Sequence, residues 1–143
     1  MNIDSIIFDL DGTLWDSSEA VAESWNQTID KLGESRSKLT VEDIKAVMGL
    51  TIEAIAAKFF PNLDDNQRLN IVKQCCEDEC KLLEVKGGIL FPKLEEVLKE
   101  LSKKYKLFIV SNCQCGYIES FFKAHKLEKY FLDFENPGIT GLT

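Results

Sequence analysis

One stretch decides how this chain folds: Ile6-Ile7-Phe8-Asp9-Leu10-Asp11-Gly12-Thr13-Leu14-Trp15-Asp16-Ser17. Its first three residues are bulky and apolar, which is typical of a strand buried on both faces in a parallel sheet. Asp9 and Asp11 follow, and residues two apart on a strand point to the same side. Gly12 permits the sharp turn that comes next. The sequence therefore predicts a buried strand over residues 6–9, with two carboxylates at its carboxyl end.

Two carboxylates so close together indicate a site for chemistry. They repel each other unless a cation or a shared proton offsets their charge. Hard oxygen ligands suit Mg²⁺, and the carboxyl ends of the strands are where open α/β sheets bind ligands. An Asp-Gly pair alone would indicate only a turn. The whole string behind a buried strand favours a functional site.

The stretch resembles the first motif of the haloacid dehalogenase superfamily, in the Asp-x-Asp-Gly-Thr-Leu-x-Asp-Ser form of its phosphatases. The resemblance is to its phosphoglycolate-phosphatase-like and β-phosphoglucomutase-like members, which carry a helical cap. It implies that Asp9 is the nucleophile that becomes an aspartyl-phosphate, and that Asp11 is the general acid and base. It also implies that Gly12 and Thr13 bind the phosphate and that Asp9 and Asp11 hold Mg²⁺. A carboxylate that attacks an anionic phosphate needs such a metal to offset repulsion.

A second motif follows the apolar run Leu107-Phe108-Ile109-Val110, which predicts another buried strand. A hydroxyl at the carboxyl end of a neighbouring strand can donate to a phosphoryl oxygen without adding charge. The string Ile-Val-Ser-Asn resembles the second motif of the family, so Ser111 and Asn112 are further phosphate-binding candidates. Alone, Ser-Asn after a strand usually starts a loop, and the Asn112 side chain could cap the following helix.

The rest of the chain shows a helical stretch followed by alternating strands and helices. Apolar residues at helical spacing predict helices over residues 18–32, 40–48, 51–60 and 64–87. Beyond residue 88 the pattern predicts a helix that starts at Pro92, the strand at 107–110, a helix over 117–125 and a strand over 130–134. Alternating strands and helices favour a parallel sheet with right-handed crossovers.

The predicted fold class is therefore α/β. A Rossmann-like parallel-sheet core, residues 1–16 and 88–143, is interrupted by an all-helical cap over residues 17–87, which matches the family architecture. The hinges of the cap fall near Asp16 and Gly87. Gly49-Leu50-Thr51 occupies a position like the substrate-sensing cap loop of phosphoglycolate-phosphatase-like members, although the end of a helix explains Gly49 as well.

The resemblance covers only the amino-terminal part of a family member. The later family motifs, a lysine that neutralises the phosphorylated aspartate and an acidic pair that completes the Mg²⁺ site, are not found in this sequence. Without the later strands, the strand at residues 6–9 is expected to form an unpaired, apolar edge of the sheet. We expect this edge to pair with another copy of the chain or with a missing carboxyl-terminal segment.

Composition excludes several other classes of protein. The formal net charge of −7 at pH 7 provides no electrostatic footprint for nucleic acid. No apolar run approaches membrane length and no signal-peptide pattern opens the chain, so we expect no membrane partner and a cytoplasmic location. The five cysteines lack the spacing of a disulfide framework, which favours buried thiols.

Taken together, these patterns predict a Mg²⁺-dependent phosphatase that hydrolyses a small phosphorylated metabolite, represented by a truncated and inactive chain. Two alternatives remain open. A phosphomutase of the same superfamily would keep both aspartates and would need cap residues that grip a second phosphate. A non-catalytic fragment or assembly module would use the exposed strand edge instead.

Overall fold

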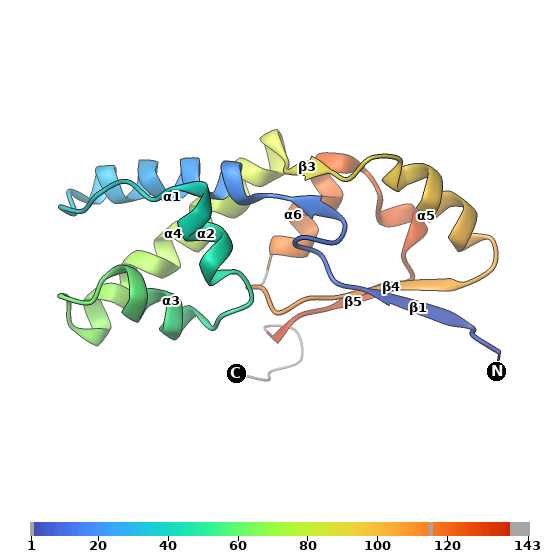
Figure 1. Cartoon of the computed structure of the whole chain (residues 1–143), viewed down its shortest axis with the longest axis horizontal. Coiled ribbons are helices and arrows are strands. Elements are labelled where there is room, and N and C mark those ends of the chain that lie inside the picture. The colour runs from blue at the N-terminus through green and yellow to red at the C-terminus, as the bar shows by residue number, and fades with distance from the viewer. Residues whose placement is uncertain (1, 115, 138–143) are drawn as a thin grey trace.

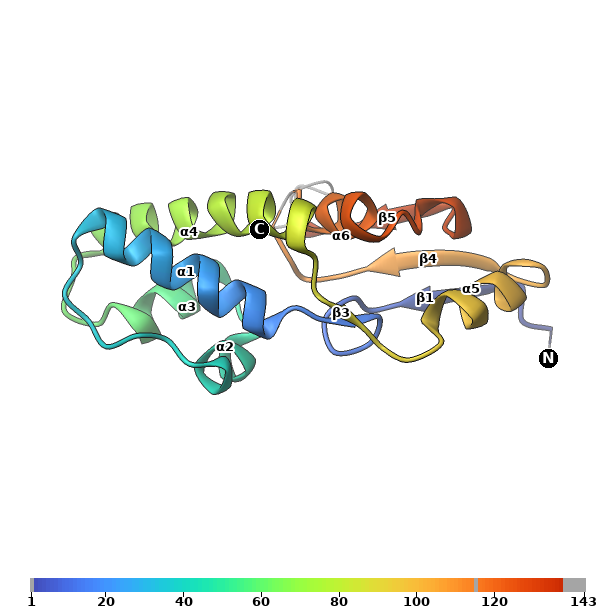
Figure 2. The same cartoon turned by 90° about the horizontal axis from the view of Figure 1, so that it is seen from above.

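The computed structural model of the protein describes residues 2–114 and 116–137. A three-stranded parallel sheet has the order β1-β4-β5, formed by β1 (Ser5–Phe8), β4 (Lys106–Val110) and β5 (Asp133–Glu135). Helices α5 (Leu94–Ser102) and α6 (Tyr117–His125) lie over one face of this sheet (Figures 1 and 2). The predicted α/β class and parallel sheet are confirmed.

Four helices are inserted between β1 and the rest of the sheet. They are α1 (Ser18–Leu32), α2 (Val41–Val47), α3 (Ile52–Phe59) and α4 (Asp65–Lys86). Helix α1 packs along α4, and α4 continues into contact with α6 of the sheet part. The inserted helices and the sheet occupy opposite ends of an elongated molecule (Figure 1).

The two connections to the insertion pair with each other, which the sequence analysis did not predict. Strands β2 (Trp15–Asp16) and β3 (Ile89–Leu90) form a short antiparallel ladder. Gly88 permits this close approach, because a Cβ atom there would lie 2.9 Å from both the Asp16 carbonyl oxygen and the Trp15 ring. The insertion is therefore joined to the sheet through a paired crossing of the chain.

Local capping interactions explain why most helix bounds were predictable. Thr40 forms a capping box with Asp43, and Asp64 forms one with Gln67 at the start of α4. Gly33 ends α1 in the left-handed conformation, with a φ angle of 71°. The predicted helices at residues 18–32 and 117–125 are confirmed to the residue.

Two predicted bounds were wrong. Helix α5 begins at Leu94, because Lys93 adopts a left-handed conformation with φ 60° and separates Pro92 from the helix. Strand β5 begins at Asp133 rather than at residue 130, because a 3₁₀ turn over Glu128–Tyr130 comes first. In that turn the Tyr130 N–H donates to the Leu127 carbonyl (3.1 Å) and is not available for a sheet ladder.

Four cysteines, Cys75, Cys76, Cys80 and Cys113, are free thiols. Burial raises the pKa of Cys75 and of Cys113 to about 12, so both stay protonated. Cys115 lies outside the described residues. None of the described helices combines the length and the apolar character needed to cross a bilayer.

Within the described residues β1 is an edge strand, as the sequence analysis expected, and it pairs only with β4. Ile6 and Phe8 pack against the core, whereas Ile7 is 66% exposed on the face that α5 and α6 leave uncovered. Val110 of β4 is 49% exposed. Covering an apolar side chain contributes about 1.5–3 kcal/mol, so this uncovered face favours association.

We predict that the chain associates in solution through this edge, and that Ile7→Lys weakens the association. Lysine on an edge strand blocks pairing with a second chain. Light scattering over a dilution series measures the effect as a fall in average mass. The control Val85→Lys changes another highly exposed apolar residue, on α4. A monomeric parent at high micromolar concentration would contradict the prediction.

Candidate active site

The first motif and the second motif meet at the carboxyl edge of the sheet. The parallel register pairs Phe8 with Ile109, so Asp9 follows β1 where Ser111 begins the loop after β4. Asp9 is exposed, and one of its oxygens, Oδ1, accepts the N–H of Leu10 (2.7 Å). Ser111 is buried, and its N–H donates to the Glu135 carbonyl (3.1 Å).

Gly12 and Thr13 form the turn that takes the chain out of the sheet. Gly12 has a φ angle of 74°, in the region that favours glycine, and its N–H donates to the Trp15 carbonyl (2.9 Å). The Thr13 N–H donates to the Leu10 carbonyl (3.2 Å). Both turn residues are exposed. The predicted sharp turn is confirmed, and it returns the chain so that Trp15 and Ser17 lie beside Asp11.

Asp11 is held by three donors on one carboxylate oxygen. Its Oδ1 accepts from Trp15 Nε1 (2.9 Å), Ser17 Oγ (3.0 Å) and Tyr117 OH (2.8 Å). Burial raises the pKa of Asp11, the three hydrogen bonds oppose this, and the charge of Asp9 raises it further. A carboxyl group with a raised pKa keeps its proton more readily, as a general acid requires.

Tyr117 is a site residue that the sequence analysis missed. It opens α6, and its hydroxyl lies 2.7 Å from Ser17 Oγ as well as beside Asp11. Burial raises the pKa of Tyr117 well above its ordinary value, so the phenol remains a neutral donor. Its ring meets the Trp15 ring edge to face at 5.9 Å. The available signal was a tyrosine at the first turn of the helix directly after the second motif.

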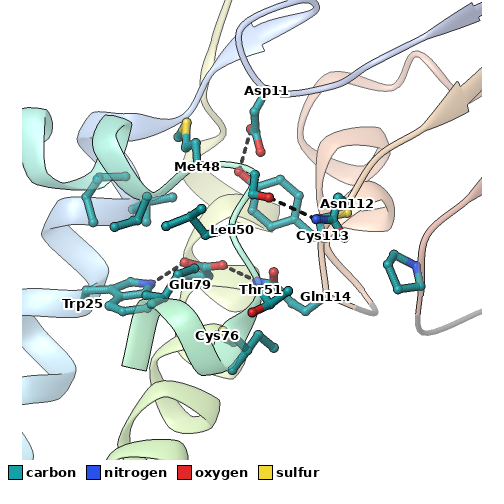
Figure 3. A pocket seen from close by; sticks show the side chains of 18 of the residues that line it. Asp11, Trp25, Met48, Leu50, Thr51, Cys76, Glu79, Asn112, Cys113 and Gln114 are labelled. Carbon is teal, nitrogen blue, oxygen red and sulfur yellow. Dashed lines mark hydrogen bonds between the residues drawn. The ribbon is translucent and has the colours of Figure 1, made fainter. Parts of the chain in front are cut away.

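A cavity of about 390 Å³ lies between the inserted helices and the loop after β4 (Figure 3). Asp11 and Asn112 line it from the sheet side, and Gly49, Leu50 and Thr51 line it from the insertion. The other predicted phosphate-binding residues and Asp9 are not among its lining residues. The cavity therefore adjoins the two motifs through Asp11 and Asn112.

Asn112 links the sheet part to the insertion. Its Nδ2 donates to the Gly49 carbonyl (3.1 Å), and the N-cap of α6 is Gly116, so the alternative that Asn112 caps this helix is wrong. Gly49 has a φ angle of 84° just beyond α2, and it also lines the cavity. It thus follows the end of a helix and also faces the cavity, while its role in sensing a substrate stays a prediction.

Glu79 of α4 is the second residue that the sequence analysis missed. Its carboxylate is buried in the cavity wall and accepts from Trp25 Nε1 of α1 and from Gln114 Nε2 of the loop after β4 (Figure 3). Burial raises the pKa of Glu79 to about 7, and the charge of Asp11 adds to the rise. The signal was its spacing: Glu79 falls on the same helical stripe as Val72, Cys76 and Leu83.

The chemistry of Asp9 fits a hard divalent cation, because an exposed carboxylate at the sheet edge is the type of ligand that Mg²⁺ prefers. The Asp11 side chain is turned toward Trp15, Ser17 and Tyr117. Among residues 2–114 and 116–137, no three His, Cys, Asp or Glu side chains converge to hold a metal. These residues supply only part of a metal site.

The fold and the site define an α/β domain with two aspartates at the carboxyl end of its first strand and a helical insertion directly behind them. The family model of the haloacid dehalogenase-like hydrolases matches residues 6–134. The chain therefore belongs to this family. Hydrolases of the family generally use a divalent metal.

Solved structures agree with this assignment. A haloacid dehalogenase-like family hydrolase from Streptococcus pneumoniae is 25% identical, with a TM-score of 0.74 over 94% of this chain and 61% of its own. A subfamily IA hydrolase of the superfamily from Geobacter sulfurreducens is 21% identical, with a TM-score of 0.68 over 95% of this chain and 63% of its own. CbbY from Rhodobacter sphaeroides, solved with xylulose 1,5-bisphosphate, is 19% identical, with a TM-score of 0.73 over 94% of this chain and 64% of its own.

The chain thus spans less than two thirds of the length of these three proteins. A search of curated proteins finds no match. The similarity to the Geobacter and Rhodobacter proteins is one of fold.

Glu79 gives the stability of the chain a testable pH dependence. Its pKa is 4.5 in the unfolded reference and about 7 when folded, so between these pH values only the folded state holds the proton. The contribution of Glu79 to the free energy of unfolding therefore falls as the pH rises from about 4.5 to about 7, by at most roughly 3 kcal/mol.

We predict that Glu79→Gln removes this loss, because the neutral amide does not titrate and Gln114 can rotate its own amide to pair with it. Urea unfolding at about pH 5.5 and about pH 8 measures the difference between parent and variant. Glu77→Gln is the control, since Glu77 is exposed on the same helix. An equal fall in the free energy of unfolding for parent and Glu79→Gln would contradict the prediction.

Proposed function

We propose that this chain contributes the catalytic aspartates and the helical cap of a Mg²⁺-dependent phosphatase that hydrolyses a small phosphate monoester. One observation carries the proposal: Asp9 stands exposed where the β1 and β4 ends meet, and Asp11, two residues on, has a raised pKa. The family match supports the hydrolase class. The division into a core (1–16 and 88–143) and a cap (17–87), and a cytoplasmic location, belong to the same proposal.

In the proposed reaction, an Asp9 carboxylate oxygen attacks phosphorus and the bond from phosphorus to the leaving oxygen breaks. Asp11 donates its proton to that leaving oxygen, which departs as an alcohol. Because three donors hold Asp11 through Oδ1, the proton is exchanged at Oδ2. Water then attacks phosphorus, Asp11 accepts the proton of the water, and the bond to Asp9 breaks.

Four further residues have proposed roles in binding the phosphate. Gly12 and Thr13 form the turn beside Asp9, and Ser111 and Asn112 follow the neighbouring strand. Mg²⁺ held by Asp9 and by the Asp11 carbonyl would neutralise charge between the attacking carboxylate and the phosphate. The family resemblance implies that a lysine and an acidic pair complete the site in a full-length member, and the solved relatives are longer than this chain.

A phosphorylated metabolite is the proposed substrate class. A phosphomutase remains the enzymatic alternative, but the described residues that line the cavity include no lysine, arginine or histidine to grip a second phosphate. The other alternative, a non-catalytic module, rests on the exposed edge of β1.

The experiment that tests the proposal is a phosphatase screen of the chain beside a version extended through the family's lysine and acidic-pair motifs. We predict activity in the extended version and its loss in Asp9→Asn, because an amide is a poor nucleophile. Removing a covalent nucleophile lowers kcat by up to about 10⁶ in a well-studied hydrolase, so we expect a fall of at least roughly a thousandfold. Turnover of the variant within a few-fold of the parent would rule out Asp9 as the nucleophile.

We also predict that the 143-residue chain binds Mg²⁺ more weakly than micromolar. Mg²⁺ gives up its water reluctantly, and the described residues do not bring three acidic side chains together. Isothermal titration calorimetry measures this, with Asp9→Asn as the control for binding at the motif. A micromolar dissociation constant that Asp9→Asn abolishes would show that the chain alone holds a complete site.

A further inference from the structure

The walls of the cavity beside Asp11 are mostly apolar. Side chains from all four inserted helices contribute to them, and Figure 3 shows Trp25, Met48 and Leu50 turned toward the same space. The cavity of about 390 Å³ lies within the range of small-ligand sites, roughly 300–1,000 Å³. It is large enough for the organic part of a small phosphate ester.

The charges around this cavity are of one sign. Asp11, Glu53 and Glu79 line it, and no lysine, arginine or histidine does so within the described part of the chain. An anionic group inside would lose part of its water without gaining a cation, and it would face the carboxylates of Asp11 and Glu79. Such an environment disfavours a second phosphate or a carboxylate.

The hydrogen bonds of the Glu79 carboxylate are supplied by the protein, so a ligand does not have to donate to it. Its two oxygens already accept from Trp25 and Gln114, so its charge is paired with fixed donors inside the wall. Gln114 lies between Glu79 and the second motif, while Asn112 spans to Gly49 on the other side. The polar groups of the wall are thus largely used by the protein itself.

We propose that this cavity takes the leaving-group part of a phosphate monoester whose organic part is uncharged and mainly apolar, and that it rejects esters with a second anionic group. The inference rests on the proposed phosphatase function for the reaction. The predicted binding preference for an uncharged, apolar ligand rests on the cavity alone. Glu79 is a specificity residue in this scheme, because its buried charge acts on the ligand without touching phosphorus.

The binding test uses two probes with the same ring and different charge, 2-phenylethanol and phenylacetate, titrated onto the 143-residue chain. The readout is the NMR signal of the Trp25 indole N–H, which points from α1 to Glu79. At about pH 8, where Glu79 is ionised, we expect 2-phenylethanol to bind at least about tenfold more tightly. Equal or tighter binding of phenylacetate, or no shift of the Trp25 signal with 2-phenylethanol, would overturn the proposal.

The variant Glu79→Gln tests the named residue. We expect it to reduce the preference for the uncharged probe by about threefold or more, since it removes a buried charge and keeps the shape of the side chain. Glu77→Gln, exposed on the same helix, is expected to leave the preference unchanged. An unchanged preference in a folded Glu79→Gln would remove Glu79 from the proposal, and if this variant does not fold, the two probes on the parent chain decide.

The catalytic test compares 2-phenylethyl phosphate with its ring-carboxylated analogue on the extended version, as the ratio of kcat/KM. We expect a ratio of at least about ten in favour of the uncharged ester. Activity with a ratio near one, or in favour of the anionic ester, would overturn the specificity and leave the phosphatase function intact. Absence of activity toward any ester would refute the phosphatase function, while the binding of the two probes still judges the cavity.

Discussion

The hydrogen bonds that converge on Asp11 connect the parts of this protein. One carboxylate oxygen accepts from the first-motif turn, from the start of α1 and from the start of α6. These three segments belong to the paired β2–β3 connection, the insertion and the sheet part. The buried oxygen needs those donors, because a carboxylate taken out of water without partners is strongly disfavoured. The requirements of one catalytic candidate thus also position the insertion relative to the sheet.

Glu79 makes a second junction of the same kind deeper in the insertion. It joins α1, through Trp25, to the loop after β4, through Gln114. The two acidic residues line one cavity; burial raises the pKa of both, and the charge of Asp11 raises the pKa of Glu79 further. A contact between the insertion and the sheet part that is built on buried carboxylates is sensitive to any charge that enters the cavity.

Much of the fold could be predicted because its signals are local. The capping residues Thr40 and Asp64 act within three residues of their own position, so the starts of α2 and α4 are visible in the sequence. Gly33 ends α1 for a similarly local reason. The pairing of β2 with β3 could not be predicted in this way, because it joins segments from distant parts of the chain.

In the candidate site, too, some features follow from local sequence signals and others from contacts between distant segments. The sequence by itself determined the α/β class, the inserted helices and the place of Asp9, Asp11 and Ser111 at the strand ends, since strand patterns and motif spacing carry this information. Only the tertiary structure decided that Tyr117 donates to Asp11 across 106 positions of sequence, and that Glu79 is buried where Cys80 is only partly so. The physical reason is that such contacts depend on how α4 and α6 pack together, and helical periodicity alone does not distinguish neighbouring positions at the border of a buried stripe.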